Sequence, residues 1–245
     1  MAAGLLAFDV VTVVFAVLFY GSSAIAAEKV YTRLAQHLPW PAAFVLASVV
    51  FLFVLVLEVS IACRLTPRPR PGRYPMMKGA VFYGWIFRMA FTRLLFLPGF
   101  KTLIFYSNVL RFLALRGLGA KVAFSASMSS DVEILDPALL TVGPGAMLGS
   151  RTLVSGHFVE NGELRLDEVH IGEGALLGFD VACGPGVVVG AKAVVQPRTS
   201  LSVRVKIGEG AVVGLGSLLE ADVVVADGAK VPAGSQLAPR TRFPS

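Results

Sequence analysis

The chain has 245 residues, 55% of them hydrophobic, and its mean hydropathy of +0.72 is too high for an ordinary soluble domain. The formal net charge of +6 is local, because residues 59–130 hold eleven Lys or Arg and no Asp or Glu, whereas residues 131–245 hold thirteen acidic and nine basic residues. Two cysteines, Cys63 and Cys183, do not make a disulfide framework, which excludes the small disulfide-stapled secreted domains.

Two apolar runs predict a transmembrane helical hairpin over residues 1–63. Leu5–Ala27 and Pro41–Cys63 are each long enough to cross a bilayer as a helix, and only a short polar stretch joins them. The first run has no basic flank and is longer than a signal-peptide core, so we expect it to remain in the mature protein. Asp9 and Glu58 lie near the ends of the runs, either at headgroup level or as functional intramembrane carboxylates.

Residues 64–118 are predicted to form a basic linker and two interfacial amphipathic helices. The bases that follow the second run mark the cytoplasmic side, and the prolines among them predict an extended linker: Arg64, Arg68, Arg70, Arg73 and Lys78. Aromatic and basic residues mix from Val81 to Leu118, as in helices that lie on anionic lipid, and Leu97-Pro98-Gly99 divides the two helices. Nucleic acid also attracts such segments, but the adjacent hairpin argues against it, and plain packing of the helices against the rest of the chain is the other alternative. We therefore expect membrane lipid as the partner, at the bacterial inner (cytoplasmic) membrane, with the rest of the chain facing the cytoplasm.

A period of six organises residues 119–245. From Ile171 to Leu237 an aliphatic residue recurs at every sixth position, with Cys183 as the one thiol in the series, and a small or β-branched residue follows four positions later. The period fits neither a helix nor a lone strand and is typical of a parallel β-helix, in which three hexads close one triangular coil. We expect the coils to begin near Lys121, irregularly, with about four coils after Ile171.

The period fails between Ser155 and Glu168, where residues are inserted or one coil bulges. Loops held on a rigid scaffold are where functional residues concentrate, and this loop contains His157. Histidine suits the role of general base in acyl transfer, and a carboxylate is needed to orient its ring. Glu160 or Glu163 is near in sequence, so we predict His157 and Glu160 as catalytic residues; the alternative is a solvent-exposed loop histidine.

His170 directly precedes the inward-facing Ile171, so alternation along the strand predicts an outward, non-catalytic side chain.

Three segments resemble the hexapeptide-repeat acyltransferase superfamily: the loop Ser155-Gly-His-Phe158, the run Val169-His-Ile-Gly-Glu-Gly-Ala175, and Val213-Gly-Leu-Gly-Ser217. The resemblance implies an all-β left-handed parallel β-helix, a homotrimer, and His157 as the general base. It also implies that the coenzyme A arm contacts three residues of the third segment: Gly214, Gly216 and Ser217. The bases that are candidates for a phosphate of the donor are Arg198, Arg204 and Lys206.

Residues 108–201 also resemble the terminal membrane domain of poly-lysine-type peptide synthetases, through Leu110–Val122, Asp136-Pro137 and His157–Glu160. This resemblance implies an aminoacyl thioester as donor and a carrier protein or synthetase as partner. The closing W-x-G-x-P motif of many hexapeptide relatives is replaced here by Gly234–Arg240.

These features predict a membrane-anchored acyltransferase. It would move an acyl or aminoacyl group from acyl-CoA or a carrier-bound thioester to an amine or hydroxyl, with no tightly bound cofactor and no metal. A non-catalytic trimeric β-helix scaffold is the alternative. A metal hydratase like the hexapeptide-repeat carbonic anhydrases is set aside, because those enzymes need two histidines at H-x4-H spacing, whereas His157 and His170 are thirteen positions apart.

Overall fold

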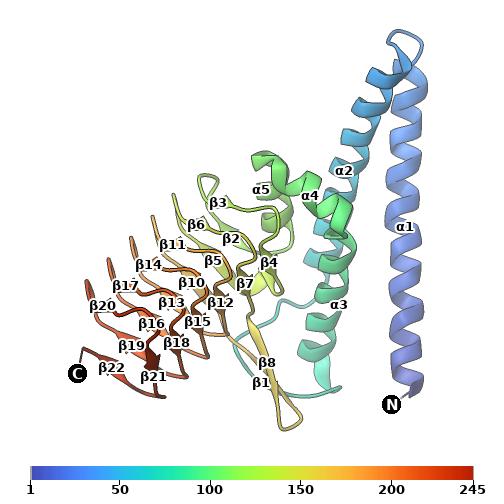
Figure 1. Cartoon of the computed structure of the whole chain (residues 1–245). Helices are drawn as coiled ribbons and strands as arrows, with labels where there is room; N and C mark the ends of the chain where they lie inside the picture. The colour runs from blue at the N-terminus through green and yellow to red at the C-terminus, as the bar shows by residue number, and fades with distance from the viewer. Residues whose placement is uncertain (1, 245) are drawn as a thin grey trace.

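The computed structural model describes residues 2–244, and side chains from residue 8 onward. A helical part leads into a stack of triangular coils (Figure 1). The helices are α1 (Ala2–Leu34), α2 (Trp40–Leu65), α3 (Gly79–Leu95), α4 (Pro98–Tyr106) and α5 (Asn108–Gly117). The hairpin of α1 and α2 projects beyond the coils, and the C-terminus lies at the far end of the stack.

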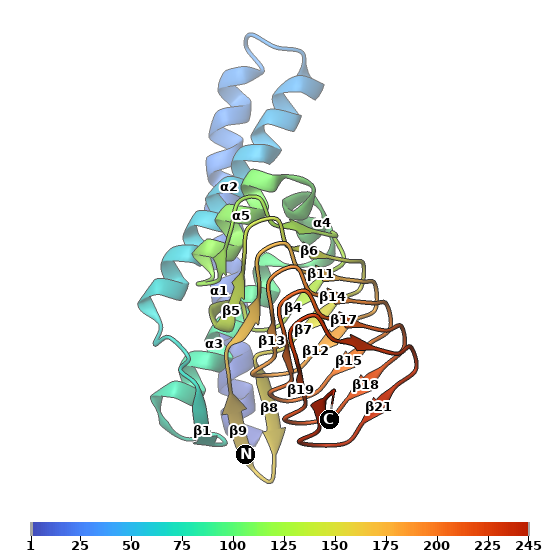
Figure 2. The same ribbon diagram turned by 90° about the vertical axis from the view of Figure 1, so that its left-hand side faces the viewer.

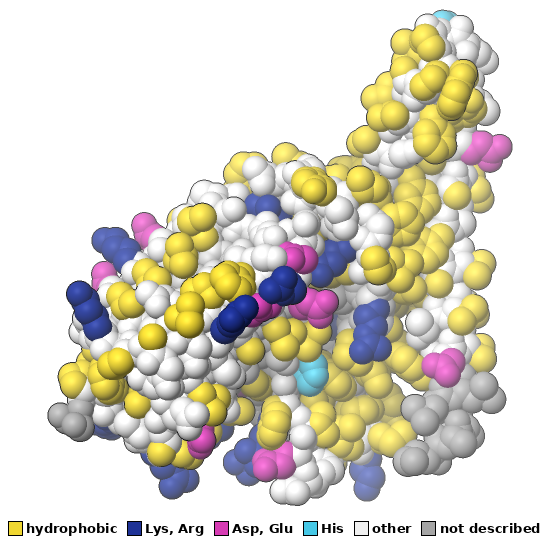
Figure 3. Space-filling view, viewed as in Figure 1, with side chains coloured by type: hydrophobic (Ala, Val, Ile, Leu, Met, Phe, Trp, Pro, Cys, Tyr) yellow, Lys and Arg dark blue, Asp and Glu magenta, His cyan; other side chains and the backbone are white. Residues whose placement is uncertain are grey.

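Two helices of the described residues, Phe8–Leu34 and Trp40–Leu65, are long and apolar enough to cross a membrane. Their outward side chains are hydrophobic along most of the hairpin (Figure 3). Between the helices, the hydroxyl of buried Ser23 donates to the Glu58 carboxylate at 3.2 Å. Glu58 therefore lies against α1 within the hairpin.

The stretch after α2 contains more regular structure than its sequence predicts. The proline-rich linker ends in strand β1 (Gly72–Pro75), which pairs antiparallel with a strand of the coil region. The aromatic and basic stretch forms three helices where two are predicted, because a further break follows Tyr106 and the hydroxyl of Ser107 caps α5. α3 and α4 meet at a bend of 77°, and together they are a third candidate for a membrane span.

The coils form a left-handed parallel β-helix whose three faces are parallel sheets (Figure 2). The first sheet contains β2 (Lys121–Val122), β5 (Leu140–Val142), β10 (Val169–Ile171), β13 (Val188–Val189), β16 (Lys206–Ile207), β19 (Val224–Val225) and β22 (Arg242–Phe243). The second contains β3 (Ser127–Met128), β6 (Met147–Leu148), β11 (Leu176–Leu177), β14 (Val194–Val195), β17 (Val212–Val213) and β20 (Lys230–Val231). The third contains β4 (Glu133–Ile134), β7 (Leu153–Val154), β12 (Ala182–Cys183), β15 (Ser200–Leu201), β18 (Leu218–Leu219) and β21 (Gln236–Leu237). The β-helix thus begins at Lys121 as predicted.

The pairing register confirms three hexads per coil. Ile171 pairs with Val189, and Val189 pairs with Ile207, so each coil advances the chain by three six-residue steps. The aliphatic positions of the repeat from Ile171 to Val231 point inward and are almost fully buried, and Leu237 in the last coil is partly buried. Cys183 shares this position, and burial raises the pKa of its thiol to about 12, so it is a neutral core residue.

The helices close the first end of the coil stack and share its core. A single cluster of buried side chains runs from Val59 of α2 through Leu115 of α5 to Val231 near the last coil. Arg111 of α5 is buried and donates to the carbonyl of Ala126 in the first coil at 2.8 Å. The helices are therefore fixed against the coils, which sets the position of α3 beside the interrupted coil.

Candidate active site

Two irregular corners lie one above the other at the start of the stack. In the first coil, a 3-10 turn (Pro137–Leu139) follows Asp136, between β4 and β5. In the second coil, the same corner, between β7 and β10, opens into an antiparallel hairpin of β8 (His157–Glu160) and β9 (Glu163–Leu166). Because both departures from the six-residue period fall on one corner of consecutive coils, residues far apart in sequence meet there.

The hairpin turns at Asn161-Gly162, where both residues have positive φ, 50° and 76°. This pair is typical of the two-residue type I′ hairpin turn. β1 adds a third strand, so the hairpin is held by a segment that precedes α3 in the chain. The break in the period is therefore an ordered three-stranded sheet, and it places His157 at the base of that sheet.

The imidazole of His157 is held by the carboxylate of Asp136. His157 Nδ1 lies 2.6 Å from Asp136 Oδ2, and the Asp136 side chain is only 3% exposed. The same carboxylate accepts hydrogen bonds from Trp85 Nε1–H of α3 at 2.7 Å and from the Gly156 amide at 2.9 Å. The indole also packs edge-on against the imidazole, with ring centroids 5.0 Å apart. Because Trp85 and Gly156 both donate to this carboxylate, its oxygens act as acceptors, which favours a proton on Nδ1 and leaves Nε2 to accept one.

Glycine at position 156 permits the contact between His157 and Asp136. A Cβ there would lie 2.9 Å from Leu139 side-chain atoms and 3.2 Å from the Asp136 Cβ. Any larger residue would push the hairpin base away from the corner of the first coil and lengthen the His157–Asp136 hydrogen bond.

The carboxylate that holds the imidazole of His157 belongs to Asp136. The prediction that Glu160 holds this imidazole is therefore wrong. Glu160 lies at the far end of β8, where it forms an ion pair of 3.4 Å with Arg165. The sequence carries a signal for Asp136. Val122 pairs with Val142, so the first coil is two residues longer than the eighteen of a regular coil, and the extra residues lie beside Asp136-Pro137.

His157 lines a cleft of about 510 Å³ between the coils and the helices. Its coil wall includes Glu133, Ile134, Leu135 and His157. Its helical wall consists of Met89, Thr92, Arg93, Phe96, Leu97 and Lys101. On this face Lys, Arg, Asp and Glu side chains lie among hydrophobic ones around a histidine (Figure 3). Within the described part of the chain, His157 Nε2 has no hydrogen-bond partner, so the ring presents a free acceptor nitrogen beside this cleft.

His170 lies outward, as predicted, with its Nε2 3.2 Å from Glu168. Across residues 2–244 no group of three His, Cys, Asp or Glu side chains is arranged to hold a metal ion.

The residues predicted to contact coenzyme A lie on later coils and do not line the His157 cleft. Ser217 is buried and donates to the Gly214 carbonyl at 2.7 Å, so its hydroxyl closes a coil corner. Gly216 has a φ of +68°, which the corner requires, and a Cβ on Gly214 would strike the backbone of the next coil at 2.4 Å.

Of the predicted phosphate contacts, Arg204 is engaged by Asp222 in a two-pronged ion pair of 2.7 and 2.8 Å. Arg198 lies over the ring of Phe179, and Lys206 is exposed on β16. The structure does not bring the three bases together with His157.

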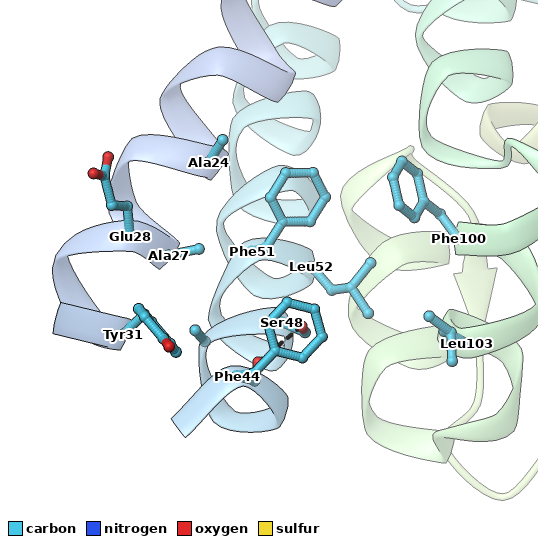
Figure 4. A pocket seen from close by; sticks show the side chains of 11 residues that line it. Ala24, Ala27, Glu28, Tyr31, Phe44, Ser48, Phe51, Leu52, Phe100 and Leu103 are labelled. Atoms are coloured by element: carbon cyan, nitrogen blue, oxygen red, sulfur yellow. Dashed lines mark hydrogen bonds between the residues drawn. The ribbon is translucent and has the colours of Figure 1, made fainter. Parts of the chain in front are cut away.

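A separate apolar pocket of about 500 Å³ lies in the helical part (Figure 4). Phe44, Phe51 and Leu52 of α2 face Phe100 and Leu103 of α4 across it. It shares no lining residue with the His157 cleft. The carboxylate of Glu28, which lines it, points away from the aromatic side chains (Figure 4).

No protein-family profile and no curated protein sequence matches the chain. Several solved structures are similar over about half of it. A hexapeptide transferase family protein from Anaplasma phagocytophilum is 20% identical, with 50% of this chain and 68% of that chain covered and a TM-score of 0.42. The acetyltransferase domain of PglB from Neisseria gonorrhoeae is 16% identical, with 55% and 61% covered and a TM-score of 0.42.

A mutant of perosamine N-acetyltransferase from Caulobacter crescentus, in complex with CoA and GDP-perosamine, is 20% identical, with 55% and 56% covered and a TM-score of 0.36. The similar proteins are thus hexapeptide-repeat transferases and acetyltransferases, and this chain spans less than two thirds of the length of the second and third.

Proposed function

We propose that the protein is a membrane-anchored acyltransferase with His157 as general base. One observation carries the proposal: a buried carboxylate, Asp136, holds His157 Nδ1 at 2.6 Å and leaves Nε2 beside a cleft. A solvent-exposed loop histidine has no reason to be fixed in this way by a carboxylate that itself accepts two further hydrogen bonds.

The reaction follows from this tautomer. Nε2 takes the proton of an acceptor amine or hydroxyl as its nitrogen or oxygen attacks the thioester carbonyl carbon. The carbon–sulfur bond then breaks, and the departing thiolate takes the proton from Nε2, so the products are an amide or ester and a free thiol. Asp136 stabilises the transient imidazolium and keeps the imidazole in the same orientation during both proton transfers.

The donor is an acyl or aminoacyl thioester, either acyl-CoA or carrier-bound. The assignment of Gly214, Gly216, Ser217, Arg198, Arg204 and Lys206 to the donor, the homotrimer, and a carrier protein or synthetase as partner stay predictions from the resemblance. In a trimer, the later coils of one subunit would face the His157 cleft of another, which is how residues that lie apart in one chain would serve one site.

The hairpin anchors the protein in the bacterial inner membrane with the coils in the cytoplasm. This orientation is supported by the two apolar helices and by the bases that follow α2, which favour the cytoplasmic side. α4 and α5 carry exposed apolar side chains that suit contact with the membrane surface: Leu103, Tyr106, Val109 and Leu113.

The test is thiol release from acetyl-CoA by the purified full chain in detergent, with an amine or hydroxyl acceptor panel and membrane lipid extract. His157→Ala is expected to lower acceptor-dependent turnover by about 10²–10⁴-fold while the protein stays folded. His170→Ala, which removes a histidine paired on the outer surface, is the matched control and keeps full turnover. Equal turnover by wild type and His157→Ala would instead support the non-catalytic scaffold.

A further inference from the structure

A second hollow adjoins the His157 cleft along the C-terminal end of α3. It measures about 360 Å³ and lies between α1 and the end of α3. Its lining is almost wholly apolar apart from three polar residues, Asp9, Thr12 and Arg93. Val13, which lines it, is 61% exposed, so this groove opens onto the apolar outer surface of α1.

The groove and the cleft share part of one helix face. Met89, Arg93 and Leu97 line both hollows, and they are spaced four residues apart, so they stack along one side of the α3 C-terminal turns and the bend that follows. A ligand could therefore pass along this edge, with one end beside His157 and the other between α1 and α3.

Charge in the cleft is divided between its two walls. Arg93 and Lys101 come from the helical wall, and Glu133 and His157 come from the coil wall. Among the described residues, neither Arg93 nor Lys101 has a carboxylate within ion-pair distance. The helical wall therefore suits an anion such as a phosphate, and the coil wall suits an amine that Glu133 attracts and His157 deprotonates.

We propose that the cleft and the groove bind one membrane amphiphile, a phospholipid-like acceptor that carries both a phosphate and a primary amine. Its apolar chain lies in the α1–α3 groove, its phosphate lies between Arg93 and Lys101, and its amine lies beside Glu133 and His157 Nε2. This inference rests on the proposed function for the reaction at the amine, but the binding site does not require that reaction to occur. Asp9, which lines the groove, lies near the start of the apolar run of α1, where a headgroup would be met.

The test uses a photoreactive phosphatidylethanolamine with a diazirine in its acyl chain, bound to the full chain in detergent micelles and mapped by mass spectrometry. Cross-links are expected on the groove residues Val13, Met89 and Leu94. Unlabelled phosphatidylethanolamine should compete best, phosphatidic acid less well because it lacks the amine, and diacylglycerol weakly because it lacks both charges. Soluble phosphoethanolamine, which lacks the chain, should not compete. Equal competition by diacylglycerol, or cross-links spread evenly over the hairpin, overturns the proposal.

Variants separate the parts of the site. Arg93→Gln with Lys101→Gln should weaken both phosphate-bearing competitors about tenfold and leave diacylglycerol unchanged. Glu133→Gln should remove the preference for phosphatidylethanolamine over phosphatidic acid. Met89→Trp should block the shared edge, whereas Leu103→Trp adds the same bulk to the separate apolar pocket and should not. The Gln variants keep the test decisive if Met89→Trp fails to fold, because both bases lie on the cleft surface.

His157→Ala separates this inference from the proposed function. It should keep specific labelling, because the histidine acts on the amine and does not hold the phosphate or the chain. If the groove is labelled specifically and His157→Ala keeps full turnover, the acyltransferase mechanism is wrong and the lipid site stands. If His157→Ala loses turnover and the groove is not labelled specifically, the mechanism stands and the lipid site is wrong.

Discussion

The coils from Ile171 onward and the coil that precedes them use the same inward packing but have different consequences. In the later coils each strand pairs in register with the strand eighteen residues on, and each hexad carries a small or β-branched residue four positions after the inward aliphatic one. In the second coil the corner before Val169 opens into the β8–β9 hairpin, and His157 meets Asp136 and Trp85 there. Repetition supplies a rigid scaffold, and the departure from repetition brings His157, Asp136 and Trp85 together.

The largest effect is expected from Asp136→Asn at the interrupted corner. The amide NH₂ would donate to Nδ1 of His157, which moves the ring proton to Nε2 and removes the acceptor lone pair. Turnover should fall about 10²–10⁴-fold, as expected when a catalytic histidine is held in the wrong tautomer. Thiol release measured beside Asp131→Asn, which removes an exposed carboxylate of the same coil, checks this. Retained turnover in Asp136→Asn would contradict the claim that the irregular corner at Asp136 takes part in acyl transfer.

Substitutions in the regular coils should lower the stability of the fold and leave turnover unchanged. Leu219→Ala removes a fully buried inward side chain and should lower the free energy of unfolding by about 2–5 kcal/mol. Leu218→Ala, its 37% exposed neighbour on the same strand, should cost much less. Thermal unfolding in detergent measures both, and both variants should keep the wild-type turnover per folded molecule. Similar losses in the two variants would contradict the inward assignment.

Trp85→Phe probes the helical contribution to the interrupted corner. It keeps an aromatic ring against His157 but removes the Nε1–H, which donates a hydrogen bond of 2.7 Å to Asp136. Loss of one such hydrogen bond should slow turnover by about tenfold. Thiol release by the purified variant, measured beside the wild type, checks this. Unchanged turnover would mean that Trp85 only packs there.

The smallest expected effect is the pH-dependent contribution of Asp131, in the first coil, to the stability of the fold. Hydrogen bonds from the Ser129 and Ser150 hydroxyls lower the pKa of Asp131 to about 2. Because the unfolded value is about 3.9, the charged carboxylate stabilises the fold above about pH 4, and this stabilisation is lost as the pH falls towards 2. Since Asp131 is exposed, Asp131→Asn should cost less than about 1 kcal/mol at pH 7. Thermal unfolding at pH 7, 4 and 2.5 should show the difference shrinking, and a constant difference would contradict the assignment.

The sequence predicts the scaffold well, because the inward position recurs every six residues and each occurrence reports the same local environment. The break in that period also draws attention to His157, whose catalytic role stays a prediction. The sequence does not predict Asp136 or Trp85, because their contact with His157 depends on which corners stack and on how α3 docks against them. Two local signals were nonetheless present: the Asn161-Gly162 turn predicts the hairpin, and the twenty-residue first coil predicts an irregular corner at Asp136.

Strand β1 gives the molecule an order of assembly. It lies between α2 and α3 in the chain, but its partner β9 is synthesised only after the first coil and most of the second. During translation α3 would therefore be made before β1 has a strand to pair with and before Asp136 is available to Trp85. A chain cut short before β9 would contain Trp85, Asp136 and His157 but would lack the central strand that joins β1 to β8.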